Sequence, residues 1–416
     1  MRLLRQPRLA LLFAGGSLNA IGTWATLIAL WGFAAYRFHA SADQVALLGL
    51  AWSLPGAVLS PVAGWPIDRF GPRAVMIASD LLGIVTSLAM AASASFTDLV
   101  VLALAAGAVQ AFGRPAGISL PPRIVDDPDL LAANALLGVA EQSAIVFGPL
   151  AGSLAISLWG IKAAFVFDAA TFVVGALAVA PLRLNPVPPT ASGGARRKDL
   201  LAGWRLARSI PDVRRTLGLA AAVFCSWGAF FVIEPLYVRD VLHRSPATLG
   251  LLQTVFGVGL IGTTALLPRI GERVASVRAL ALAVGASGLA AALYVGTNYL
   301  GVAMVGVFLW GIDVAFFMPP MQTLLQRSTP IDAHGRVMAL ASTVDGAGSL
   351  VAIPLAGVAV GAMGVSATGI LVGALAVAAG AGGLAVSPRR RPAEQVAMAL
   401  SSREGAVLVE TDGRDM

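Results

Sequence analysis

The sequence predicts an all-α membrane protein in which twelve transmembrane helices form two pseudo-symmetric six-helix bundles. Three observations predict this fold. Hydrophobic residues make up 57% of the 416 residues and charged residues only 12%, whereas a soluble domain carries about 25% charged residues. The charges gather between long apolar stretches, and two short sequence blocks of the first half recur in the second half. An ordinary soluble fold and a disordered chain are both excluded by this composition.

Apolar stretches place the helices in order along the chain. A bilayer-spanning helix needs about 20 apolar residues. Runs of this length with no more than one charge predict helices that start near residues 9, 44, 73, 98, 131, 161, 216, 247, 277, 299, 337 and 366. The first run is too long for a signal peptide, so we expect it to remain as the first helix.

Basic residues predict how the chain threads through the membrane. With twelve helices, 24 of the 29 Lys and Arg residues fall on the side of the amino terminus. Because basic loops stay inside, this side is expected to be cytoplasmic and the protein to be a multi-pass protein of the cell (inner or plasma) membrane. The same loops account for the net charge of +7, so we expect no nucleic-acid partner.

Four segments follow from this threading. We expect an N-terminal six-helix bundle over residues 1–182 and a C-terminal six-helix bundle over 216–386. A cytoplasmic linker, 183–215, opens rich in Pro and Gly and continues with the spacing of a short amphipathic helix. The polar tail, 387–416, is expected to be disordered and cytoplasmic, and the protein to be a monomer.

An internal repeat relates the two bundles. Residues 112–115 align with 317–320, and the four residues Pro149–Gly152 recur as Pro354–Gly357, both at an offset of 205 residues. Two six-helix halves joined by a long central loop form the parallel repeat of one large class of secondary transporters.

The loop after the second helix carries a regularly spaced motif. Gly64 allows close helix approach, Asp68 and Arg69 supply an ion-paired latch, Gly71 permits a tight turn, and Arg73 holds the start of the third helix. This pattern, G-x-x-x-D-R-x-G-x-R, resembles the cytoplasmic loop signature of the major facilitator superfamily. The resemblance implies a secondary transporter that alternates access between its two halves. It also implies that Asp68 meets Arg336, at the start of the eleventh helix, when the halves close on the inside.

A second motif narrows the class within that superfamily. Gly148, Pro149 and Gly152 in the fifth helix resemble the G-P-x-x-G core of its exporters, although Ala144 and Ser153 stand where further glycines are expected. Scattered matches resemble the enterobactin-exporter and macrolide-efflux branch of drug:proton antiporters. One of them is the stretch from Leu236 to Leu242.

Charges inside predicted spans mark candidate transport residues, because a charge in the membrane usually faces a cavity or a partner. Glu141 and Asp345 lie near the midplane and fall one position apart under the repeat. We expect them to line a central cavity and one or both to carry the coupled proton. The other candidates are Asp313, Asp80, Arg114, Asp168 and Glu234, of which Glu234 is expected near the outer rim. Asp80 and Arg114 are expected to form structural ion pairs, with each other or with nearby loops.

Neutral polar and aromatic side chains complete the candidate site. Asn19, Trp24, Gln110, Gln142 and Thr343 fall within spans and can bind cargo, although helix packing is an equally ordinary role. The three His residues are too dispersed for a metal site, and no G-x-x-x-x-G-K-[ST] motif occurs, so neither a metal, a cofactor nor ATP is expected.

The sequence as a whole favours export of a hydrophobic or amphipathic small molecule, such as a drug, siderophore or secondary metabolite, by proton antiport. An importer of a nutrient or siderophore on the same fold stays open as an alternative. A non-transporting membrane scaffold is disfavoured by the intact loop motif. An enzyme is disfavoured because no nucleophile and His lie at a common depth.

Overall fold

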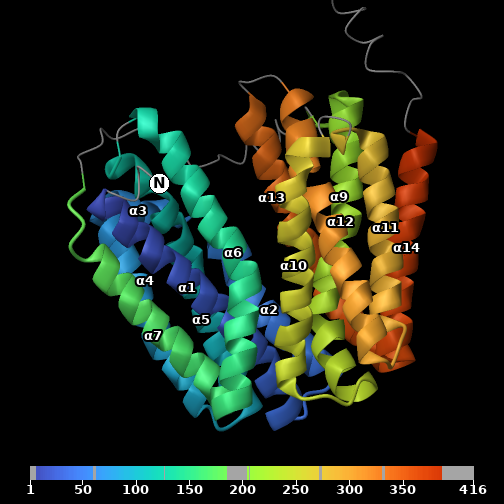
Figure 1. The fold of residues 1–416 in the computed structure, drawn as a ribbon, viewed down its shortest axis with the longest axis horizontal. Coiled ribbons are helices and arrows are strands. Elements are labelled where there is room, and N and C mark those ends of the chain that lie inside the picture. The colour runs from blue at the N-terminus through green and yellow to red at the C-terminus, as the bar shows by residue number, and fades with distance from the viewer. Residues whose placement is uncertain are drawn as a thin grey trace, which may run out of the picture.

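Twelve long apolar helices make up the fold (Figure 1). The computed structural model describes residues 6–59, 62–125, 127–184, 204–205, 207–270, 274–329 and 333–386. Within these ranges every regular element is helical, and the twelve helices able to cross a membrane confirm the predicted fold. They are α1 (Pro7–Gly32), α2 (Ala42–Leu59), α4 (Pro72–Ala92), α5 (Phe96–Ile118), α6 (Asp127–Trp159), α7 (Ile161–Val179), α9 (Pro211–Leu236), α10 (Pro246–Ile270), α11 (Val277–Val295), α12 (Leu300–Arg327), α13 (His334–Met363) and α14 (Val365–Val386).

Helix packing divides the molecule into two bundles. In the first bundle α1 packs against α6 and α7, α4 packs against α5 and α7, and α2 packs against α5. The second bundle repeats these pairings with α9 against α13 and α14, α11 against α12 and α14, and α10 against α12. Figure 1 shows α1 to α7 on one side of the molecule and α9 to α14 on the other, with α2 reaching toward the second bundle.

Backbone details repeat as well. α1 and α9 each end in one π-helical turn, η2 (Phe33–Arg37) and η5 (Tyr237–Val241). Each turn is followed by a His in the left-handed region, His39 at φ 49° and His243 at φ 50°. A non-glycine residue rarely adopts this conformation, so its recurrence 204 residues later supports the predicted duplication. The offset is 205 at residues 112–115 and at Pro149–Gly152, so the second half has one extra residue between His243 and residue 317.

The two sides of the bundle differ in charge and in packing. We call the side with the start of α1 and the short helix α3 (Gly64–Phe70) the arginine-rich side, because Arg69, Arg73, Arg123 and Arg327 lie at helix ends there. A further short helix on this side is η4 (Pro121–Arg123). The predicted amphipathic segment is described only at residues 204–205 and 207–210, and the tail 387–416 lies outside the described residues.

The halves approach each other closely on the side opposite the arginines. A Cβ built on Gly250 of α10 would meet the Pro149 carbonyl of α6 at 2.7 Å, and one built on Gly357 of α13 would meet the Ala46 Cβ of α2 at 2.8 Å. Ser153 also donates a 2.8 Å hydrogen bond to the Ala247 carbonyl. Figure 1 shows the bundles diverging from this contact toward the arginine-rich side. The molecule is therefore closed at one side and spread at the other.

Candidate functional site

A charged cluster lies between the two bundles. Arg114 of α5 forms a 2.6 Å ion pair with Glu141 of α6, through its Nη2 atom and Oε1 of the carboxylate. The Arg114 guanidinium also interacts electrostatically with Asp345 of α13, which belongs to the other bundle. We call Arg114, Glu141 and Asp345 the central site. Its formal charge is −1 when both carboxylates are ionised.

The central site is open rather than buried. The Arg114 and Glu141 side chains are 70% and 60% exposed, and Asp345 is exposed as well. Arg114 therefore pairs with Glu141 and not with Asp80, contrary to one of the two arrangements expected from the sequence. All three charges lie in the region where the halves diverge. The tight contact between the bundles is on the other side.

Two of the neutral candidates are exposed and two are engaged within the first bundle. Gln142 neighbours Glu141 on α6 and is exposed, and Thr343 is exposed on α13 with its hydroxyl donating to the Ala339 carbonyl at 2.9 Å. Asn19 donates a 2.9 Å hydrogen bond to Asp80, and Gln110 donates to the Thr23 hydroxyl at 3.2 Å. Asn19 and Gln110 thus link helices within one half.

Two further carboxylates are buried inside the first bundle. Asp168 of α7 accepts hydrogen bonds from Thr26 at 2.8 Å and Ser87 at 2.7 Å, both on Oδ2. Its Oδ1 atom has no partner, and neither does Oδ2 of Asp80. A cavity of about 10 Å³ beside Asp168 is lined by Thr23, Thr26 and Ser87, among others. This volume accommodates about one water molecule, and Asp168 does not reach the central site.

The second bundle buries Glu234 and Asp313 separately. Glu234 of α9 accepts hydrogen bonds from the Tyr294 hydroxyl at 2.6 Å and from Gln253 at 2.5 Å. It is only 7% exposed, so its carboxylate is enclosed in this structure, and its expected place at the outer rim stays a prediction. The aromatic rings of Tyr294, Phe230 and Trp310 pack together beside it and exclude solvent. Asp313 lies on α12, away from Glu234.

The loop motif forms a tight helical turn before α4. Gly71 has a φ of 83°, which requires glycine at this position, and Arg73 donates a hydrogen bond to the Ala180 carbonyl at the end of α7. Arg69 lies over the rings of Trp65 and Phe70 at 5.8 and 5.6 Å. Arg73 therefore ties the motif to its own bundle.

The meeting of Asp68 with Arg336 is expected in a different arrangement of the halves and stays a prediction. Figure 1 shows α3 well apart from α13, because the bundles diverge on this side. An inner latch between Asp68 and α13 stays a prediction for the state in which the arginine-rich side is closed.

The exporter motif lies where three helices meet. A Cβ on Gly148 would come within 2.3 Å of the Trp24 Cβ, and one on Gly152 within 2.9 Å of the Ala25 Cα, both on α1. The carbonyl of Pro149 faces Gly250 of the second bundle. The two glycines thus let α6 pack tightly on α1, while Pro149 contacts the other half. Trp24 packs here against α6, at the position of Gly148.

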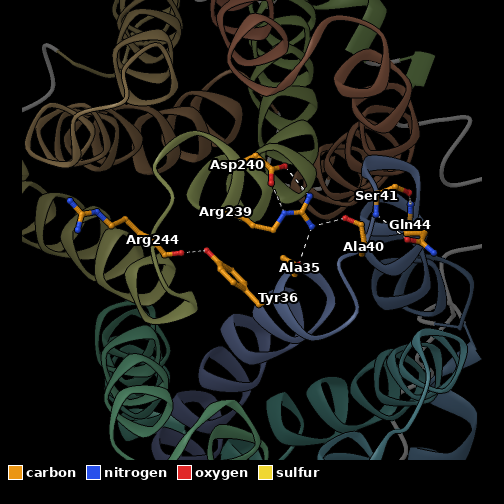
Figure 2. A network of polar contacts seen from close by, with 8 residues as sticks. All are labelled: Ala35, Tyr36, Ala40, Ser41, Gln44, Arg239, Asp240 and Arg244. Atoms are coloured by element: carbon orange, nitrogen blue, oxygen red, sulfur yellow. Dashed lines mark hydrogen bonds and ion pairs between the residues drawn. The ribbon is translucent and has the colours of Figure 1, made fainter.

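A polar network closes the side opposite the arginines (Figure 2). From η5, the Arg239 Nη1 atom donates to the carbonyls of Ala35 at 3.0 Å and Ala40 at 2.8 Å, which belong to the first bundle. The Tyr36 hydroxyl of η2 donates in return to the Arg244 carbonyl. We call Arg239, Tyr36 and their carbonyl partners the outer latch.

Asp240 holds the Arg239 side chain in place. Its carboxylate pairs with Nε at 2.5 Å and with Nη2 at 2.8 Å, which leaves Nη1 directed at the first bundle (Figure 2). Sequence reasoning noted this Arg-Asp pair only as part of a family resemblance. The sequence did contain one indication of this contact: Arg239 and Asp240 are adjacent, on the side of the membrane that carries few basic residues.

The fold and this arrangement of charges define a two-bundle membrane transporter. The sequence profile described as Major Facilitator Superfamily matches residues 12–243 and 216–404. The chain therefore belongs to the Major Facilitator Superfamily, as its loop motif led us to expect, and it is a transporter of small-molecule cargo rather than an enzyme.

Relatives support the resemblance to efflux transporters. The chain is 27% identical to the multidrug efflux pump Tap of Mycolicibacterium fortuitum, over 88% of this chain and 91% of Tap. It is 25% identical to the multidrug resistance protein MdtG of Klebsiella pneumoniae, over 76% and 77%. It is also 23% identical to the MFS-type transporter YfiS of Bacillus subtilis, over 90% and 92%.

Solved structures share the fold. A bacterial homologue of the human lysosomal transporter Spinster, in an inward-facing and unoccupied conformation, aligns with a TM-score of 0.71 at 15% identity, over 92% of this chain and 97% of that one. The nucleoside transporter NupG aligns with a TM-score of 0.73 at 10% identity, over 91% and 98%.

Proposed function

We propose that the chain exports hydrophobic or amphipathic small molecules across the cell membrane by alternating access, in exchange for protons. The observation that carries this proposal is the central site, in which Arg114 and Glu141 of one bundle face Asp345 of the other. The similarity to Tap and MdtG supports export as the direction. The arginine-rich side is taken as cytoplasmic, with both termini there and one chain per transporter.

Charge balance at the central site suggests how the exchange is coupled. One of its two negative charges is neutralised by Arg114, and among the described residues no second Lys, Arg or His forms an ion pair at this site. Either a proton or a positively charged cargo can supply the missing charge, but the two compete. Cargo that enters from the cytoplasm therefore displaces the proton, and a proton that enters from outside favours cargo release. Such competition produces antiport when the halves rock only with the site occupied.

Access to the central site alternates as the halves rock. In the structure the outer latch holds one side closed while the charged cluster is exposed toward the arginine-rich side. Breaking the outer latch and forming the inner latch at Asp68 would turn the site to the outside. In this scheme the outer latch stabilises the state that is open to the cytoplasm, and the inner latch stabilises the state that is open to the outside.

A coupled transport assay tests the proposal. Inside-out vesicles that contain the protein are loaded with a pH gradient, acidic inside, and the accumulation of a fluorescent lipophilic cation is followed. Glu141→Gln and Asp345→Asn should each lower gradient-driven accumulation about tenfold or more, since each removes an ionisable group of the central site. Asp43→Asn, on the first turn of α2, serves as the matched control.

Three results would contradict the proposal. Accumulation that is independent of the pH gradient rejects proton coupling. Loss of cation from the vesicles, driven by the same gradient, indicates import. Full activity in both variants removes the central site as the place of coupling.

A further inference from the structure

A groove opens between α11 and α12, away from the central site. Its volume is about 340 Å³, within the range of about 300–1,000 Å³ that small-molecule sites occupy. Its lining is apolar except for a single carboxylate and includes Leu289, Leu293, Leu309, Ile312, Phe316 and Asp313. The groove therefore combines an apolar wall with one acidic group.

The groove faces the lipid. The main contacts of α11 are all within the second bundle, with α9, α12 and α14, and Figure 1 shows α11 far from the first bundle. Leu289 and Leu309 on its walls are 65% and 42% exposed. In a twelve-span membrane protein, apolar side chains exposed on this perimeter contact acyl chains. A molecule dissolved in the bilayer can reach the groove without passing through the central site.

Asp313 forms the floor of the groove at membrane depth, in the half of the membrane nearer the arginine-rich side. It follows the start of α12 by 13 residues, a rise of about 20 Å in a hydrocarbon core about 30 Å thick. The carboxylate is 7% exposed and is hydrogen-bonded by the Ser287 hydroxyl, which accepts a 3.0 Å bond from Nε1 of Trp310. Among the described residues, no Lys, Arg or His forms a salt bridge with Asp313.

A lipid acyl chain could pack against the apolar walls of the groove, but it carries no charge to pair with the Asp313 carboxylate at its floor. In its ionised form, a carboxylate held by one hydroxyl in an apolar groove lacks a counter-charge, and intramembrane charges are normally paired. An apolar molecule with one positive charge matches both the apolar walls and the acidic floor. We propose that the groove is a lateral binding site for lipophilic cations taken from the bilayer, with Asp313 as the counter-ion. The site is separate from the central site, and binding there does not depend on the direction or the coupling of transport.

Binding to the purified full chain tests this site directly. The protein carries Glu141→Gln and Asp345→Asn, so that the central site contributes no carboxylate, and is placed in phosphatidylcholine nanodiscs. Binding of radiolabelled tetraphenylphosphonium is measured by equilibrium dialysis. Asp313→Asn should weaken the affinity about tenfold, and Leu309→Trp should weaken it by filling the groove. Asp313→Glu, which keeps the charge, should retain binding.

Two controls make the result decisive. Leu282→Trp adds the same bulk at an exposed position of α11 that does not line the groove, and binding should be unchanged. Tetraphenylborate has the same shape and the opposite charge; measured on its own, because it would pair with tetraphenylphosphonium in solution, it should bind much more weakly. If Asp313→Asn and Leu309→Trp both bind as the parent does, no such site exists. If tetraphenylborate binds equally well, the groove recognises only the apolar part of the ligand, and Asp313 is not a counter-ion.

Discussion

At the residue scale, exposure decides what the ion pair between Arg114 and Glu141 contributes. Exposed ion pairs stabilise a fold by about 0–1 kcal/mol, because solvent screens them and side-chain entropy opposes them. The two side chains are 70% and 60% exposed, so their bond contributes little to holding α5 against α6. We expect the pair to matter for transport instead, because it sets the net charge of the central site next to Asp345.

Replacing Arg114 should therefore separate stability from transport. In Arg114→Ala the central site changes from −1 to −2, and cation exchange should slow at least about tenfold because release of the bound cation becomes harder. Thermal stability in detergent should shift by less than about 2 °C. Adding Glu141→Gln restores the charge of −1 and should recover part of the activity. Equal rates in wild type and Arg114→Ala would show that this charge does not matter.

The glycines of α6 allow a matched test of close packing. A Cβ at position 148 would overlap Trp24 of α1, whereas one at Gly138 meets nothing within 4 Å. Gly148→Val should destabilise the fold by roughly 1–3 kcal/mol, the usual effect of overpacking, and lower the amount of protein in the membrane. Gly138→Val on the same helix should leave both quantities near wild type. The measurement is fluorescence-detected size exclusion after heating.

Side-chain partners were the part of the site that the sequence could not supply. Residue spacing predicted that Glu141 and Asp345 lie at similar depth on related helices. It did not predict that Asp80 pairs with Asn19 or that Glu234 is enclosed by Tyr294 and Gln253. Depth follows from counting along a helix, whereas partners depend on rotation about the helix axis, which packing fixes.

At the element scale, the ends of α1 and α9 carry the outer latch. Both helices end in a π-helical turn that widens the last turn, and π-turns occur frequently at functional sites. The contacts that Arg239 of η5 makes with the first bundle are with the backbone carbonyls of Ala35 and Ala40. Because carbonyls are present whatever the side chain, sequence patterns on α1 gave no sign of this contact.

Loss of Arg239 should favour opening on the outer side. A Cys placed at Ser153, in a Cys225→Ser background, reports on that side because Ser153 lies at the α6–α10 contact. Arg239→Ala should raise the rate at which this Cys reacts with a membrane-impermeant maleimide by about fivefold or more, corresponding to about 1 kcal/mol.

Arg37→Ala is the control for this measurement. Arg37 lies on η2 of the same side and over the Phe38 ring, and within the described part of the chain no hydrogen bond or ion pair joins it to the second bundle. Its loss should leave the labelling rate unchanged. A labelling rate that does not respond to Arg239→Ala would mean that apolar contacts alone close this side.

The loop helix α3 carries the residue predicted to form the opposite contact, Asp68. Asp68→Asn removes the negative charge that would face the start of α13 and Arg336 when the arginine-rich side closes, where a helix amino terminus favours an anion. Transport should fall while the amount of protein in the membrane stays normal. Asp212→Asn, in a half-buried pair with Arg215 on the same side, should leave transport near the wild-type rate. Transport at the normal rate in Asp68→Asn would exclude the latch.

At the scale of the whole molecule, the sequence predicted the helices and the two bundles, but not how the bundles are placed relative to each other in this state. Charge-free runs and the repeat predicted twelve spans in two bundles, and both are confirmed. Which side is closed was not predictable, because the same helices and the same internal contacts serve every state of a rocking transporter. Only the contacts between bundles differ, and several of these involve glycine or backbone carbonyls, such as Gly250 and Ala40.

A reversible cross-link between the bundles tests whether their rocking is required. A Cβ at Gly49 of α2 would lie 3.3 Å from Cγ2 of Ile353 on α13, so a Cys pair at these positions is close enough to bridge. In a Cys225→Ser background, oxidation of Gly49→Cys/Ile353→Cys should stop transport by holding the outer side closed, and reduction should restore it. The control bridge lies inside the second bundle, between Gly348→Cys and the native Cys225, where the built Cβ is 3.5 Å from Sγ. Oxidising it should leave transport intact, because the bundles still move as rigid bodies. Transport that survives oxidation of the first bridge would mean that cargo crosses without separation of the two halves on this side.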